Sequence, residues 1–230
     1  MNSLFVISLP RSLSSLTYYI ARVALGLQAP SWTSDGEIMN IDRFALYAGP
    51  RDDANVKFLV KEDRPDLFQR ATAFLDQATV PTSFAYKDVI HPFVVSEWLK
   101  QSEFRVLRIK RNLTDVAFSM LAHKWFYPKA ASRTQDDLES AVIEGLIRAD
   151  MALDSVPAEH VDFDELIRDE SVLRNALLKL YPEAAVLTFQ YLNEPFCAFR
   201  DQQVLHRRTL DQYKRLEEMV QKSLDSISPA

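Results

Sequence analysis

The sequence predicts an α/β fold in which a central parallel β-sheet is flanked by helices. Short apolar runs alternate with longer amphipathic stretches along the chain, an order that is typical of parallel sheets with helical crossovers. The length of 230 residues and the hydrophobic fraction of 47% are sufficient for one sizeable buried core. No internal repeat, low-complexity tract or Gly/Ser linker divides the chain. We therefore expect a single domain over residues 1–230.

Four segments are predicted to be strands. The first, Leu4–Leu9, is a largely apolar run that stops at Pro10. The other three combine apolar, aromatic or β-branched residues: Ser83–Tyr86, Phe104–Ile109 and His160–Phe163. Because ligands of parallel sheets bind beyond the carboxyl ends of the strands, functional residues are expected in the loops that follow these segments.

The stretches between the strands carry helical patterns. Gln135–Ser155 is amphipathic, and adjacent aspartates near its start favour a helix N-terminus. The other predicted helices are Leu16–Leu27, Asp63–Ala78, Pro92–Gln101, a segment from Asn112 to about Lys124, Asp164–Arg168, Val172–Tyr181 and Leu205–Ser226. In contrast, Asp35–Ala54 is predicted to be rich in loops because Gly36, Gly49 and Pro50 interrupt it.

Composition argues against several classes of protein. The 27 basic and 32 acidic residues give a net charge of −5, which argues against a surface that coats nucleic acid. Cys197 is the single cysteine and the four histidines are scattered, so neither a disulfide nor a metal centre is expected. The apolar run Leu4–Leu9 is too short to span a membrane, and Arg11 follows it rather than preceding it, so no membrane or export segment is predicted. We expect a cytoplasmic protein, and the sequence leaves its oligomeric state open.

The loop that joins the first strand to the first helix has the chemistry of an anion site. A strand-to-helix turn directs backbone N–H groups and the positive end of the helix dipole to one point. Arg11 adds a guanidinium, and Ser12, Ser14 and Ser15 add hydroxyl donors. The GxxxxGK[ST] pattern of a Walker loop is absent. The alternative interpretation is that these serines only cap the helix.

A second segment with this chemistry follows the strand Phe104–Ile109. Arg111 lies at the carboxyl end of the strand and Ser119 lies two turns into the next helix. If that helix folds back toward the strand end, both side chains can reach one anion. The alternative is an ordinary strand–turn–helix connection that is capped by Asn112 or Thr114.

Taken together, the two segments resemble those of PAPS-dependent sulfotransferases, which use 3′-phosphoadenosine 5′-phosphosulfate (PAPS). In the 5′-phosphosulfate loop of that family, Pro-Lys/Arg-Ser-Gly-Thr-Thr/Ser, Arg11 matches the basic residue, and Ser14 and Ser15 match the hydroxyl pair. The run from Arg111 to Ser119 resembles the family's 3′-phosphate motif. The motif sequences are most similar to those of the tyrosylprotein, Golgi-type and bacterial sulfotransferases. This resemblance implies a P-loop-like architecture. It also implies PAPS as donor, 3′-phosphoadenosine 5′-phosphate (PAP) as product, and no metal.

Leu13 stands where the family has glycine. A leucine with a positive φ is strained by roughly 1 kcal/mol or more. We therefore expect Leu13 to have a negative φ, in the helical or bridge region, and to begin the helix early. Its side chain is expected to point away from the donor and to pack against apolar neighbours. The alternative is a decayed site in which the leucine blocks the sulfate.

Two further segments extend the predicted donor site. Val161–Glu170 resembles the family's Tyr-Glu-Asp-Leu stretch, which places Phe163 at the aromatic position that lies against the adenine. Phe163 is otherwise a core residue that ends a strand. Arg207 and Arg208, in a basic cluster with His206, resemble the basic residues that close over the 3′-phosphate late in the family's chain. The alternative for this cluster is a solvated helix face.

The resemblance also assigns catalytic residues. Arg11 is the natural cation for the leaving phosphate, and Lys87 resembles the sulfate-facing lysine of the tyrosylprotein sulfotransferases. The base has three candidates. Glu37 is favoured because it resembles the Gly-Glu pair of Golgi-type sulfotransferases. His91 titrates near neutrality without help, and Asp88 qualifies only if it points inward.

We therefore expect an enzyme that moves a sulfuryl group from PAPS to a hydroxyl or amine of a small-molecule acceptor. Several aromatic residues either line an acceptor pocket or belong to the core: Trp32, Phe44, Tyr47, Trp125, Phe126 and Tyr127. Two alternatives stay open. One is a degenerate sulfotransferase-fold protein that binds the nucleotide without transfer, which Leu13 supports. The other is a P-loop kinase-like enzyme, which requires a Walker lysine that this loop lacks.

Overall fold

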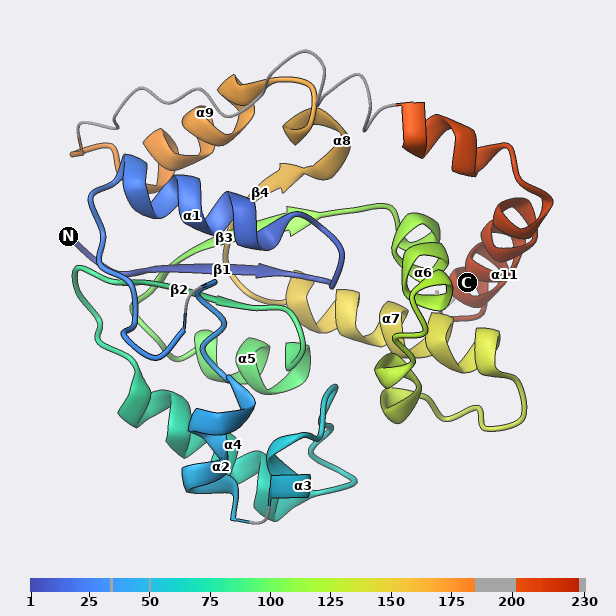
Figure 1. Cartoon of the computed structure of the whole chain (residues 1–230), viewed down its shortest axis with the longest axis horizontal. Helices are drawn as coiled ribbons and strands as arrows, with labels where there is room; N and C mark the ends of the chain where they lie inside the picture. The colour runs from blue at the N-terminus through green and yellow to red at the C-terminus, as the bar shows by residue number, and fades with distance from the viewer. Residues whose placement is uncertain (34, 50, 185–201, 228–230) are drawn as a thin grey trace.

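The central sheet has four parallel strands in the order β2-β1-β3-β4 (Figure 1). The computed structural model describes residues 1–33, 35–49, 51–184 and 202–227. The strands are β1 (Leu4–Ser8), β2 (Ala85–Asp88), β3 (Arg105–Lys110) and β4 (Glu159–Asp162). Each lies within about two residues of a segment that the sequence predicts, and the parallel α/β class is confirmed.

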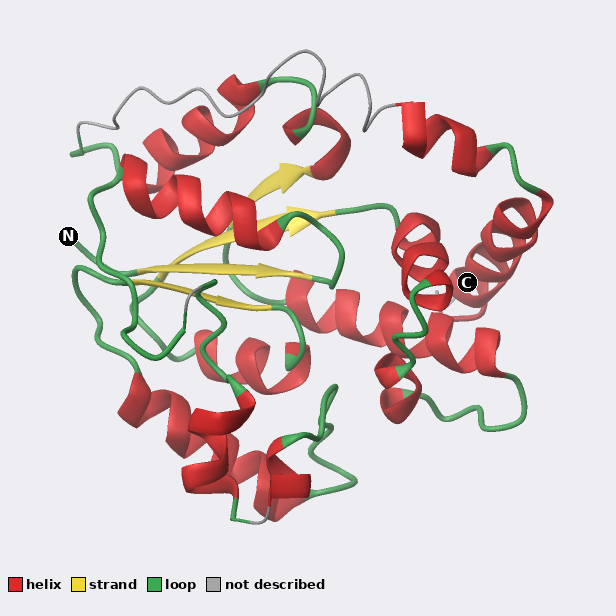
Figure 2. Cartoon of the chain, viewed as in Figure 1, coloured by secondary structure: helices red, strands yellow, loops and turns green. Residues whose placement is uncertain are grey.

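Helices cover both faces of the sheet (Figure 2). Their bounds are α1 (Ser14–Ala24), α2 (Ile41–Ala48), α3 (Arg51–Ala54), α4 (Pro65–Ala78), α5 (Pro92–Leu99), α6 (Leu113–Ala122), α7 (Leu138–Asp154), α8 (Phe163–Leu166), α9 (Glu170–Leu180) and α11 (Asp211–Ile227), with a 3₁₀ turn, η1 (Tyr127–Ala131). Residues 202–208 are also helical. Among the described residues, no helix combines the length and apolar character needed to cross a membrane.

The core has two parts because successive side chains of a strand point to opposite faces. Leu4 and Val6 of β1 pack with α1, α8 and α9, whereas Phe5 and Ile7 pack with α4, α5 and α7. All five residues of β1 are therefore buried, as in a strand with helices on both sides. Full burial of each such apolar side chain contributes roughly 1.5–3 kcal/mol.

Three segments differ from the sequence predictions. Asp35–Ala54 contains the helices α2 and α3, because its glycines lie before and after α2 and delimit it rather than preventing it. The predicted helix Leu205–Ser226 is interrupted at residues 209–210. Phe163 begins α8 instead of ending a strand, because the Asp162 side chain accepts from the first-turn N–H groups of α8. Cys197 lies outside the described residues.

The strand order determines where a site can form. The chain passes from β1 to β2 on one side and returns to β3 on the other side of β1. The loops that follow β1 and β3 therefore diverge around a crevice at the carboxyl edge of the sheet. Those loops contain Arg11 and Arg111.

Candidate active site

The loop between β1 and α1 forms one wall of a cavity of about 840 Å³. Every residue from Pro10 to Leu16 lines it. Within the described residues, no side chain caps the first turn of α1, and the Ser12 hydroxyl donates instead to the carbonyl of Pro10 at 3.5 Å. The serines therefore do not act as caps for this helix. The first-turn N–H groups and the positive end of the helix dipole remain available to an anion.

The expectation of a negative φ at Leu13 is wrong. Leu13 has φ 57° and ψ 22°, in the left-handed region, and Arg11 also has a positive φ of 67°. The tight reversal from β1 into α1 thus takes the left-handed path that glycine usually provides, at a cost of about 1–2 kcal/mol for the leucine. The partly buried Leu13 side chain offsets this cost by packing against the apolar cluster of β1, α1 and α9.

We expect the Leu13→Gly variant to be more stable than Leu13→Ala by about 1 kcal/mol. Both variants lose the leucine packing, but only glycine relieves the left-handed strain. Urea unfolding followed by circular dichroism measures the difference. A more stable alanine variant would show that φ is negative in solution. Affinity of Leu13→Gly for PAP should match that of the wild type, whereas a gain would indicate that leucine blocks the site.

Arg11 and Ser119 meet across the cavity although they lie far apart in the sequence. The Nε of Arg11 donates to the Ser119 Oγ at 3.1 Å, and its guanidinium lies 5.1 Å from the centroid of the Trp125 ring. Helix α6 therefore folds back toward the end of β1. Asn112 also caps α6, by accepting from the N–H groups of Thr114 and Asp115. The capping interpretation and the fold-back are thus both present in one segment.

Arg111 is held in place from two sides. Its Nη1 donates to the carbonyl of Arg11, and its guanidinium lies 4.2 Å from the centroid of the Phe163 ring. Phe163 is buried and lines the cavity beneath that guanidinium. The loops after β1, β3 and β4 are therefore tied together at the carboxyl edge of the sheet.

The cavity has a surplus of positive charge near Arg111. Arg11, Arg111 and Arg207 all line it. Burial lowers the pKa of Arg111 to about 10; Asp115 opposes this shift, and Arg207 and Arg11 add to it. The Nε of Arg111 is buried without a hydrogen-bond partner among the described residues. Clustered guanidinium groups with an unused donor are suited to an anionic ligand.

Arg208 has a different environment from Arg207. It does not line the cavity, and its Nη2 lies 2.6 Å from the Asp115 carboxylate and 3.0 Å from the Asp164 carboxylate. These hydrogen bonds raise the pKa of Arg208 despite the opposing effect of burial. Arg208 thus anchors the 202–208 helix to α6 and α8, and Arg207 is left facing the cavity.

Glu37 and Lys87 form a largely buried ion pair on another wall of the cavity. The Lys87 N–H donates to the Gly36 carbonyl at 2.8 Å, and the Ile38 N–H donates to the Lys87 carbonyl at 2.9 Å. This short parallel bridge places the Glu37 Oε2 2.5 Å from the Lys87 Nζ. Gly36 is required because its φ is +81° and an added Cβ would lie 2.4 Å from the Tyr18 ring.

The surroundings of the pair shift its titration. The side chain of Glu37 is 12% exposed and that of Lys87 is 2% exposed. Burial raises the pKa of Glu37 to about 8, the nearby Asp88 adds to this shift, and Lys87 opposes it. The Lys87 Nζ also lies 3.4 Å from the Asp35 carboxylate. A carboxylate with a raised pKa at a cavity wall has the chemistry of a general base.

His91 and Asp88, the other candidates for the base, do not line the cavity. The His91 ring is buried at the start of α5, and its Nδ1 lies 3.0 Å from the Asp88 Oδ2. Among the aromatic candidates, only the run from Trp125 to Tyr127 lines the cavity. Trp32 and Phe44 pack in the core, and the Tyr47 side chain lies outside the described residues.

Several residues of the cavity wall were not predicted from the sequence. They are Asp35, Lys57, Val89, Ile90, Lys124, Gln203 and Val204. Lys57 and Lys124 belong to no motif in the sequence. Only the fold brings the Lys57 Nζ to within 5.1 Å of the Tyr127 ring centroid. Asp35 could have been predicted as a cavity residue only from its position beside the Gly36-Glu37 pair.

Comparison with known proteins gives similarity at the level of structure. No family model and no curated protein matches the sequence. The chain is similar to a sulfotransferase from Alicyclobacillus acidocaldarius, at 15% identity and a TM-score of 0.48 over 96% of each chain. It is also similar to the sulfotransferase domain from the curacin biosynthetic pathway, at 11% identity and a TM-score of 0.45, covering 84% of this chain and 75% of that one.

A third similar structure is retinol dehydratase in complex with androsterone and the inactive cofactor PAP. It shares 14% identity with a TM-score of 0.39, and the match covers 99% of this chain and 82% of that one. At these identities and scores the similarity concerns the course of the backbone alone. The function of this protein is therefore inferred from the residues that line its cavity.

Proposed function

We propose that the protein is a PAPS-dependent sulfotransferase that acts on a hydroxyl or amine of a small molecule. The observation that carries the proposal is the composition of one cavity at the carboxyl edge of the sheet. It combines the uncapped first turn of α1, a cluster of three guanidinium groups, and a buried carboxylate–ammonium pair. The cavity therefore holds groups suited to binding an anion next to groups suited to proton transfer.

The residues present fit a donor with two separate anionic groups. The loop of Arg11, Ser14 and Ser15 suits the phosphosulfate, and Arg111 with Arg207 suits the 3′-phosphate. The Phe163 ring provides an apolar surface for the adenine of the donor, although the Arg111 guanidinium lies over that ring in this structure. Ser119 accepts from the Arg11 Nε and lines the cavity, so its hydroxyl is available to the same donor.

The chemistry follows from the same positions. Glu37 takes the proton of the acceptor as the acceptor oxygen or nitrogen forms its bond to sulfur, and the bond from sulfur to the 5′-phosphate oxygen breaks. Lys87 stabilises charge on the sulfuryl oxygens, and Arg11 stabilises the charge that develops on the leaving phosphate. Trp125 and Tyr127 provide the apolar wall against which an acceptor would lie.

Binding of PAP tests the proposal without knowledge of the acceptor. We expect PAP to bind at least about tenfold more tightly than adenosine 5′-monophosphate, because Arg111 and Arg207 gain an anionic partner. Isothermal titration calorimetry with PAP, the monophosphate and ATP with Mg²⁺ measures this order. Preference for ATP with Mg²⁺ would favour the kinase-like alternative. PAP binding without transfer of sulfate from radiolabelled PAPS to any of a panel of phenols, alcohols and amines would favour a degenerate protein that binds the nucleotide without catalysis.

A further inference from the structure

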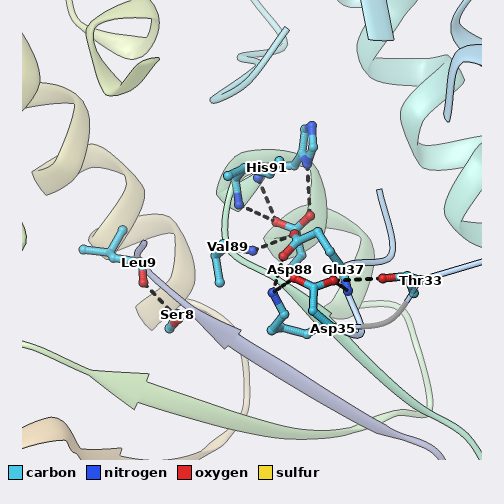
Figure 3. A network of polar contacts seen from close by, with 10 residues as sticks. Ser8, Leu9, Thr33, Asp35, Glu37, Asp88, Val89 and His91 are labelled. Atoms are coloured by element: carbon cyan, nitrogen blue, oxygen red, sulfur yellow. Dashed lines mark hydrogen bonds and ion pairs between the residues drawn. The ribbon is translucent and has the colours of Figure 1, made fainter. Parts of the chain in front are cut away.

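A second buried pair, Asp88 and His91, lies next to Glu37 (Figure 3), and neither residue lines the cavity. The Asp88 Oδ1 accepts from the N–H groups of Ile90 at 3.0 Å and of His91 at 2.7 Å. Its Oδ2 lies 3.0 Å from the His91 Nδ1. Both side chains are only 1% exposed. The Asp88 carboxylate is therefore fixed by three donors and cannot rotate without losing them.

Asp88 also lies beside the Glu37 carboxyl group, where the two can share a hydrogen bond when one of them carries a proton. Two carboxyl groups form such a bond only when one of them carries a proton. The donors around Asp88 favour its ionised form, so a proton taken up by the two carboxyl groups resides on Glu37. Burial opposes ionisation of Asp88, yet His91 and the backbone donors lower its pKa below the ordinary value. The Val89 N–H, which donates to the Glu37 Oε1 at 3.1 Å, completes the link between the two groups.

We propose that Asp88 and His91 act as a positioning dyad for Glu37: His91 keeps Asp88 ionised, and Asp88 orients the Glu37 carboxyl and holds its proton. The inference rests on the proposed role of Glu37 as base. His91 itself does not contact an acceptor in the cavity, because its ring is buried and is not part of the cavity wall. Its contribution is exerted through Asp88 alone.

Other groups also face these carboxyls and have to be separated from the dyad. Lys87 and Asp35 lie on the cavity side of Glu37, and Tyr127 interacts electrostatically with both Glu37 and Asp88. On the far side, the Phe44 ring lies edge-on to His91 with 6.4 Å between ring centroids. Asp88 is the only one of these charged groups that connects Glu37 to His91. A change at Asp88 therefore isolates the dyad.

Asp88→Asn is the informative variant, because its amide oxygen still accepts the two backbone N–H groups while the negative charge is lost. We expect Glu37 to lose its proton at least about one pH unit lower in this variant than in the wild type. NMR titration of the isotope-labelled side-chain carboxyl carbon of Glu37 measures this directly. Asp76→Asn is the matched control, because Asp76 accepts from the Trp98 Nε1 at 2.8 Å outside the cavity, and should leave the titration unchanged.

His91 variants test the second half of the dyad. His91→Asn retains a donor toward Asp88, so the titration of Glu37 should resemble that of the wild type, whereas His91→Leu should alter it. In transfer assays, His91→Leu should lower kcat by about tenfold and leave the PAP Kd unchanged. Circular dichroism checks that each variant is folded.

Identical Glu37 titrations in the wild type and Asp88→Asn would overturn the proposal. The NMR readout needs no acceptor and no PAPS. A shifted titration in a protein that neither binds PAP nor transfers sulfate would therefore retain the dyad's control of Glu37 and reject the sulfotransferase function.

Discussion

Replacement of Glu37 by glutamine is expected to lower the rate of sulfuryl transfer at least about a hundredfold, the usual scale for a general base. Affinity for PAP should stay within about twofold, because Arg11 and Arg111 are untouched and glutamine retains an oxygen for the Val89 N–H. Single-turnover transfer from radiolabelled PAPS gives the rate, and calorimetry gives the affinity. Glu97→Gln is the matched control, since Glu97 pairs with Lys61 on the surface.

The pH dependence of the wild type provides an independent check. Glu37 is active as a base only when ionised, and its pKa is raised by burial to about 8. The transfer rate should therefore increase with pH and level off above about 8. The glutamine variant should lack this acidic limb. A hundredfold loss in His91→Ala together with a near-normal Glu37→Gln would show that the base was assigned to the wrong residue.

The sheet and the two anion loops could be predicted because their signals are contiguous in the sequence. A strand buried on both faces is a largely apolar run, as at Leu4–Leu9, and a motif at a strand end spans only about ten consecutive residues. The candidate residues at Arg11, Lys87 and Arg111 were found in this way. The structure places all three on the wall of one cavity.

What could not be predicted depends on distant contacts. The pairing of Arg11 with Ser119 requires the fold-back of α6, and the burial of Glu37 requires the bridge between residues 36–38 and β2. Leu13 breaks a local preference at the site, since apolar packing outweighs its backbone strain. A prediction from local backbone preference alone therefore gave Leu13 a negative φ.

Arg111→Ala is expected to weaken PAP binding by about 2–3 kcal/mol, or about 30–150-fold, as for loss of a charge-assisted pair. Arg111 is partly buried, and its buried Nε has no partner among the described residues, so an arriving phosphate gains a partly desolvated cation. Affinity for adenosine 5′-phosphosulfate, which lacks the 3′-phosphate, should barely change. Calorimetry with both ligands measures the two effects side by side.

PAP and adenosine 5′-phosphosulfate have to be compared because Arg111 also supports the loop between β1 and α1. Its Nη1 donates to the Arg11 carbonyl, so truncation disturbs the phosphosulfate site as well as removing a cation. Such a disturbance weakens both ligands, whereas loss of the 3′-phosphate contact weakens PAP alone. Arg111→Lys should give an intermediate loss for PAP, because lysine keeps the charge but loses the fork and the stacking on Phe163. Arg215→Ala, at a surface ion pair with Glu139, should affect neither ligand. Equal losses of PAP and adenosine 5′-phosphosulfate in Arg111→Ala would place the 3′-phosphate away from Arg111.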